Sequence, residues 1–118
     1  MEFNGQALAY LGDAVYEVLV REYLLKQGLT KSKNLHQEAV KWTSALGQVE
    51  KLKKIENVLT EEELTIIKKG RNAPLTRKAR NVDLASYHYA TGLEALFGYL
   101  YMSNNQTRIE DLFHQMHD

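Results

Sequence analysis

The sequence predicts an all-α domain, and three observations carry this prediction. Apolar residues recur at intervals of three and four along several long segments, which is the period of an amphipathic helix. The only proline among the 118 residues is Pro74, so nothing interrupts those segments. No segment keeps the strict apolar–polar alternation of a half-buried strand. With 44% hydrophobic residues at this length, the chain suits one domain around one core.

The first expected helix follows Asn4, a favourable N-cap residue, and runs to about Gln27, with Gly28 as its C-cap. Between Leu8 and Val20 it is apolar around most of its circumference, whereas a surface helix normally shows one apolar face. We therefore expect this helix to be the centre of the core, to lie in a subunit interface, or both.

Two shorter helices are expected next. One is capped by Thr30 or Ser32 and ends at Thr43, and the other runs from about residue 44 to residue 57. A capping box, Thr60 with Glu63 three residues later, opens a further helix that ends near residue 70.

Residues 71–81, which contain Pro74, form the one clear loop. Asp83 should cap a long helix to about Met102, and a last helix is expected from about Thr107. The long helix has an expected buried stripe, which consists of Ala85, Tyr89, Leu93, Leu96 and Leu100.

The charge of the chain is unevenly distributed although its net value is zero. Residues 68–80 hold six of the fifteen basic residues and no acid, which leaves a net charge of −6 on the remainder. Such a basic segment on an acidic body is either a contact surface for a polyanion or a solvated loop.

The composition also excludes some kinds of protein. There is no cysteine, so disulfides and thiolate metal sites are excluded. The first residues lack the pattern of a secretory signal, and no apolar run approaches the ~20 residues of a membrane span. We expect a cytoplasmic protein without a membrane partner.

Two acids, Asp13 and Glu94, sit in the middle of the two most apolar helices. Burying either carboxylate would cost several kcal/mol without compensation. If the two helices pack together, the converging carboxylates favour a cation, and oxygen ligands suit Mg²⁺ or Mn²⁺. Glu17, one turn after Asp13, could add an outer acid. Alternatively, Asp13 bonds a neighbouring helix end and Glu94 is exposed.

Several motifs resemble those of a known family. Residues 8–15, L-A-Y-L-G-D-A-V, resemble the ribonuclease III signature L-E-F-L-G-D-A/S-V, and residues 93–98, L-E-A-L-F-G, resemble the family's second acidic motif, D-x-x-E-A-L-I-G. The spellings K-K-G-R-N-A and Y-x-Y-A-T-x-x-E-A-L-F-G-Y-L-Y are similar to the Mini-ribonuclease III branch, which consists of the catalytic domain alone. The resemblance runs from about Asn4 to Tyr101. It implies a single ribonuclease III endonuclease-like helical domain over residues 1–118, with no double-stranded-RNA-binding domain.

This resemblance implies a Mg²⁺-dependent endoribonuclease that hydrolyses double-stranded RNA. Asp13 and Glu94 would be the catalytic residues and hold the metal, which lowers the pKa of a bound water and polarises the scissile phosphate. The products would carry 5′-phosphate and 3′-hydroxyl ends. Glu17 and Thr91 would lie just outside the metal ligands. The branch points to maturation of large-subunit ribosomal RNA precursor.

The match to the family's acids is incomplete. Asp13 and Glu94 match two of its four carboxylates, but the other two positions hold Ala9 and Thr91, and a further upstream acid aligns near Gln6. A two-metal site is therefore in doubt. The Mini-ribonuclease III branch likewise has fewer of these acidic residues.

Cutting both strands of a duplex requires two active sites, so the resemblance also implies a homodimer, with Tyr10, Ala14 and Tyr16 as interface residues. The expected RNA contacts lie in the basic segment: Arg71, Asn72, Arg77, Lys78 and Arg80. Two alternatives stay open at this point. One is a catalytically silent module that binds structured ribosomal RNA, and the other is a dimerisation domain with an incidental basic loop.

Overall fold

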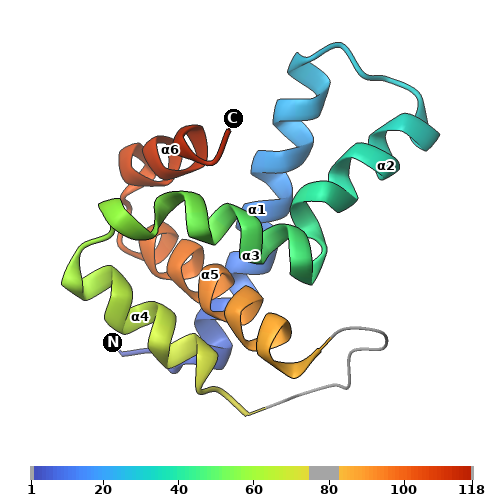
Figure 1. The fold of residues 1–118 in the computed structure, drawn as a ribbon. Coiled ribbons are helices and arrows are strands. Elements are labelled where there is room, and N and C mark those ends of the chain that lie inside the picture. Colours follow the sequence, from blue (N-terminus) through green and yellow to red (C-terminus); the bar gives the residue numbers. More distant parts are fainter. Residues whose placement is uncertain (1, 75–82, 118) are drawn as a thin grey trace.

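The computed structural model describes residues 2–74 and 83–117, and within these ranges all regular structure is helical (Figure 1). The all-α prediction is therefore confirmed. The elements, in chain order, are α1 (Gly5–Lys26), α2 (Ser32–Thr43), α3 (Ala45–Ile55), the 3₁₀ helix η1 (Glu56–Val58), α4 (Glu61–Arg71), α5 (Leu84–Met102) and α6 (Gln106–Gln115).

Helix α5 is the centre of the molecule. It runs through the middle of Figure 1 and packs against α1, α4, α3 and α6. From Gly92 to Gly98 only Glu94 escapes full burial, so this segment is enclosed on nearly every side. The centre of the fold is thus α5, whereas α1 keeps one face in solvent. The expected burial of Ala85 is wrong, because the first two residues of α5 are exposed.

One main hydrophobic cluster joins all six α-helices of the described residues, and a smaller one lies where α1, α4 and α5 meet. The side chains of the main cluster that are fully buried or nearly so include Tyr16, Val20, Ile55, Leu93, Leu96, Phe97, Ile109, Leu112 and Met116.

Three of the predicted caps are confirmed. Asn4 Oδ1 accepts a hydrogen bond from the backbone N–H of Ala7 at 2.7 Å. Both bonds of the box formed by Thr60 and Glu63 are present, and Asp83 caps α5. Each cap satisfies N–H groups that have no partner within their own helix.

Three helix starts differ slightly from the prediction. Helix α2 begins at Ser32 itself after Lys31, whose side chain makes no capping hydrogen bond in the described structure. Ser44 caps α3 instead of opening it, and Asn105 caps α6 one residue before the expected start. The third helix also ends early, at Ile55, because the next three residues tighten into η1.

Helices α1 and α5 touch backbone to backbone at two glycines. A Cβ atom on Gly12 would overlap the carbonyl group of Glu94, and one on Gly98 would overlap the carbonyl group of Leu8. Only glycine permits so close an approach. Because Asp13 follows Gly12 in the chain, this contact also brings the two predicted acids near each other.

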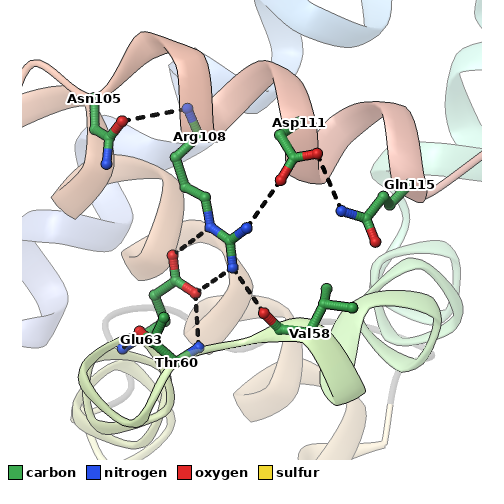
Figure 2. A network of polar contacts seen from close by, with 7 residues as sticks. All are labelled: Val58, Thr60, Glu63, Asn105, Arg108, Asp111 and Gln115. Carbon is green, nitrogen blue, oxygen red and sulfur yellow. Dashed lines mark hydrogen bonds and ion pairs between the residues drawn. The ribbon is translucent and has the colours of Figure 1, made fainter.

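Helix α6 is fastened to α4 by Arg108 (Figure 2). Its guanidinium group donates two hydrogen bonds of 2.8 Å to the carboxylate of Glu63, one of 2.8 Å to the carbonyl of Val58 and one of 2.9 Å to Asp111. Glu63 is 5% exposed. The hydrogen bonds from Arg108 are the main cause that lowers the pKa of Glu63, which stays charged although it is buried.

Candidate active site

A cavity of about 560 Å³ lies between α1, α5 and the end of α4. Its lining combines polar and apolar side chains and consists of Gln6, Ala9, Tyr10, Asp13, Ala73, Pro74, Tyr87, Thr91 and Glu94. Asp13 comes from α1 and Glu94 from α5, so two residues 81 positions apart share one cavity. The expectation that the two long helices bring these acids together agrees with this geometry.

The environments of the two acids differ from those expected. Asp13 is exposed and Glu94 is half-buried. The neighbour of Asp13, Gly12, faces α5, and this turns the aspartate toward the solvent side of the cavity. Asp13 is therefore hydrated, and the large cost of burying a carboxylate does not arise in this chain.

The half-buried Glu94 is in contact with a third helix. Gln48 on α3, which is 4% exposed, donates a hydrogen bond from Nε2 to Glu94 Oε2 at 3.3 Å. Sequence reasoning missed Gln48, because a single glutamine in a lysine-rich helix carries no pattern that marks it.

The buried side chain of Tyr16 lies close enough to Glu94 for the charge of the glutamate to affect the pKa of the phenol. Its hydroxyl donates a hydrogen bond of 2.8 Å to the carbonyl of Trp42. Burial raises the pKa of Tyr16 most, and the negative charges of Glu94 and Glu17 raise it further. The phenol therefore stays protonated and serves as a hydrogen-bond donor.

The structure does not bring Glu17 to the cavity. Glu17 accepts a hydrogen bond from Arg21 Nε at 3.1 Å and lines a separate groove between α1 and α2. Its expected role just outside the metal ligands stays a prediction. Thr91 does line the cavity, but its hydroxyl donates to the carbonyl of Tyr87 at 2.9 Å, within its own helix.

All three positions at which the family resemblance expects further acids line this cavity: Gln6, Ala9 and Thr91. Within the described residues no group of three or more histidine, cysteine, aspartate or glutamate side chains is placed to hold a metal ion. The cavity therefore offers two carboxylates, with uncharged side chains in the remaining positions.

A second hollow, of about 430 Å³, is lined by Arg71, Asn72, Ala85, His88 and Tyr89. It adjoins the first, because the two residues after Asn72 line the active-site cavity. The guanidinium carbon of Arg71 lies 4.3 Å from the centre of the Tyr89 ring, a cation–π contact that orients this exposed side chain. Of the expected RNA contacts, Arg77, Lys78 and Arg80 lie outside the described residues.

One face of α1 is apolar and exposed. Tyr10, Val18 and Leu25 are 87%, 64% and 57% exposed, and Ala14 between them is exposed too. Tyr16 is only 1% exposed, so its expected role as an interface residue is wrong: it points into the core of its own chain. Because the helix is apolar around most of its circumference, the sequence alone could not show which side chains point to the core and which to solvent.

The helical architecture and the two-acid cavity agree with a nuclease family. Residues 6–105 match the Ribonuclease III domain, so the chain belongs to the ribonuclease III family and is an endoribonuclease. Its particular branch follows from the curated relatives that cover nearly the whole chain.

These relatives are Mini-ribonuclease 3 proteins. The one from Streptococcus pneumoniae is 47% identical, with 92% of this chain and 87% of the relative covered. The one from Enterococcus faecalis is 42% identical, over 94% and 86%. This chain falls in the Mini-ribonuclease 3 branch, as its motifs predicted. The alternatives of a silent RNA-binding module and of a dimerisation domain are set aside accordingly.

The fold has a close counterpart among solved structures. A crystal structure of a protein from Fusobacterium nucleatum superposes with a TM-score of 0.87 at 32% identity, and the match covers 96% of this chain and 92% of the other. In the part of the chain that the structure describes, we find no helix with the length and apolarity needed to cross a membrane.

Proposed function

We propose that this endoribonuclease hydrolyses double-stranded RNA with the help of Mg²⁺ held by Asp13 and Glu94. The observation that carries the proposal is the shared cavity: these two acids, from different helices, both line it. One carboxylate is hydrated and the other is half-buried, so both can be reached by an ion and by RNA from solvent.

The side chains of the cavity fit Mg²⁺. Mg²⁺ is commonly bound through one or two carboxylates, keeps several waters and takes phosphate oxygens of the substrate as further ligands. The cavity provides two carboxylates, and the oxygens of Gln6 and Thr91 add neutral acceptors. The absence of cysteine from the chain and of histidine from the cavity lining argues against zinc. Mn²⁺ could replace Mg²⁺ at such a site.

A bound divalent ion would supply charge stabilisation at the scissile phosphate and an activated water. The two carboxylates hold this position and keep the mouth of the cavity negative, so a phosphate approaches it only together with a cation. Attack of water on phosphorus with cleavage of the P–O3′ bond would leave a 5′-phosphate and, after protonation of the leaving oxygen, a 3′-hydroxyl. No cysteine is present to form a covalent intermediate.

Residues of the basic segment would bind the RNA backbone. Arg71 is held against Tyr89 with its guanidinium accessible, and Asn72 follows it at the end of α4. We propose that these two residues, with Arg77, Lys78 and Arg80, contact phosphates and riboses of an A-form duplex. Of these residues, Arg71 and Asn72 lie next to the two-acid cavity, because the two residues that follow them line it.

We further propose a homodimer that forms through the exposed apolar face of α1, with Tyr10 and Ala14 at its centre. Several large apolar side chains exposed on one helix face, here interrupted by Arg21, favour an interaction surface. Two copies would supply the two active sites that cleavage of both strands requires.

We propose that residues 1–118 act as a catalytic domain in the cytoplasm. Its substrate would be the precursor of large-subunit ribosomal RNA. The names of the relatives support a ribonuclease, whereas this substrate rests on the resemblance of the motifs. A pulse-chase analysis of ribosomal RNA ends in cells that lack the protein tests it. Unchanged ends on large-subunit RNA would contradict this substrate.

Cleavage of a duplex RNA with Mg²⁺ and with EDTA tests the activity. Asp13→Asn and Glu94→Gln should each lower kcat by about a hundredfold or more, since each removes one charge from the site. Glu110→Gln is the matched control, because Glu110 lies exposed on α6, away from the cavity. Normal cleavage by Asp13→Asn, or full activity in EDTA, would refute the proposed metal site.

A further inference from the structure

We propose that Gln48 is a positioning residue for Glu94. Its amide N–H holds one oxygen of the glutamate and thereby restricts how the carboxylate turns within the cavity where the metal would bind. This inference rests on the proposed function of Glu94 as a metal ligand. It adds to that function a residue on a helix from which no described lining residue of the cavity comes.

The local structure fixes where Gln48 lies. Ser44 caps α3 by accepting a hydrogen bond from the backbone N–H of Gly47 at 3.0 Å, and the N–H of Gln48 bonds the Ser44 carbonyl at 2.9 Å. A Cβ atom on Gly47 would overlap the carbonyl group of Lys41, so the turn from α2 into α3 is tightly closed. The first turn of α3 therefore has little freedom to shift along α5.

The direction of the hydrogen bond follows from the chemistry of the two groups. An ionised carboxylate only accepts hydrogen bonds, so the amide nitrogen of Gln48, not its oxygen, must face Glu94. Gln48 is 4% exposed, so water cannot readily replace this donor. At 3.3 Å the bond is longer than a typical charge-assisted hydrogen bond of about 2.7–2.9 Å, so its role is to restrict the orientation of the carboxylate.

Glu94 needs such a partner more than Asp13 does. A glutamate side chain has one more rotatable bond than an aspartate, so more conformational freedom must be removed before it can bind a metal. The bond from Gln48 to Oε2 restricts the carboxylate before the ion arrives, which is the preorganisation that metal ligands commonly receive from their neighbours.

The test compares Gln48→Met with a control on the same helix. Methionine keeps the approximate volume of glutamine and removes the donor. Ile55→Val is the control, because Ile55 is fully buried on α3 and loses only one methylene group. The primary measurement is the Kd for Mn²⁺ of the RNA-free protein, followed by electron paramagnetic resonance. Thermal unfolding of both variants reports their stability.

We expect Gln48→Met to bind Mn²⁺ roughly tenfold more weakly, about the effect of one hydrogen bond to a charged group. At limiting Mg²⁺ its kcat should fall while the KM for duplex RNA is unchanged, and saturating Mg²⁺ should restore kcat. Ile55→Val should keep the wild-type Kd. Gln48→Asn retains the amide on a side chain one carbon shorter, and it should reproduce the loss if the methionine variant fails to fold.

Two results would overturn the inference. One is a wild-type Kd for Mn²⁺ in both Gln48 variants while Asp13→Asn binds Mn²⁺ weakly. The other is an equal loss in Ile55→Val, which would make packing of α3 the cause. If Asp13→Asn itself keeps the wild-type Kd, the metal site of the proposed function fails, and this inference fails with it.

Discussion

The close contact between α1 and α5 makes a sharp prediction about Gly98. In Gly98→Ala, the added Cβ would lie 2.8 Å from the carbonyl carbon of Leu8 and 3.1 Å from the backbone nitrogen of Gly12. Carbon atoms in contact normally stay about 3.5–4.0 Å apart. The two helices must therefore separate by about 1 Å, because the obstructing atoms are backbone and cannot rotate away.

The effect on stability is the difference of two terms. Overpacking of this kind costs about 1–3 kcal/mol, and more where backbone must move. Alanine recovers up to about 1 kcal/mol through its higher helix propensity. We expect a net destabilisation of about 2 kcal/mol, which lowers Tm by roughly 8 °C in a chain of this size.

The effect on activity should exceed the effect on stability. Asp13 follows Gly12 on α1, and Glu94 lies one turn before Gly98 on α5, so separating the helices moves the two acids apart. A misplacement of about 1 Å can lower a rate by about a hundredfold. Cleavage of duplex RNA, measured well below the Tm of the variant, should show a loss of this size.

Gly28→Ala is the matched control. Gly28 has φ +89°, and no atom lies within 4 Å of a Cβ added there. Alanine in this left-handed conformation costs about 1–2 kcal/mol, so its Tm should fall while cleavage is unchanged. The reasoning is refuted if Gly98→Ala cuts RNA at the wild-type rate, or if both variants lose activity in proportion to stability.

Four further predictions follow from the same structure. Thr91→Asp adds a carboxylate to the cavity and should tighten Mn²⁺ binding at least severalfold in a direct titration. Repulsion between the three carboxylates should lower the Tm in EDTA. An unchanged Kd for Mn²⁺ would contradict the placement of position 91 in the same cavity as Asp13 and Glu94. Arg108→Met should cost about 3 kcal/mol in urea unfolding at neutral pH, because buried Glu63 loses its partner. Since Arg108 lowers the folded-state pKa of Glu63, that stabilisation is present above pH ~4.5 and disappears as the pH falls through the folded pKa. The difference in free energy of unfolding between Arg108→Met and the wild type should therefore shrink in acid. A difference that does not change with pH would contradict this reasoning. Arg71→Ala should reduce the slope of log K against log salt for duplex RNA by about 0.7–0.9, and no change would remove Arg71 from the RNA contacts. Val18→Glu should convert a dimer to a monomer in sedimentation, whereas Glu22→Gln should not; a dimeric Val18→Glu would exclude this face of α1.

The helices and most of their ends could be predicted because they depend on residues close together in the chain. A cap such as Asn4 or the box of Thr60 with Glu63 is formed within one turn, so its meaning is visible in a short window of sequence. The same holds for the motifs around Asp13 and Glu94, whose spacing and spelling indicate the family without any knowledge of packing.

The direction in which a side chain points depended on contacts between distant segments. Tyr16 and Tyr10 belong to the same apolar run, yet one is buried and the other is exposed, because α5 covers only one side of α1. Asp13 is hydrated for the same reason. The pairing of Gln48 with Glu94 joins residues 46 positions apart, and that of Arg108 with Glu63 joins residues 45 apart. Local sequence encodes a helix and its period, but only the close approach of whole helices decides which faces meet and therefore which side chains complete the site.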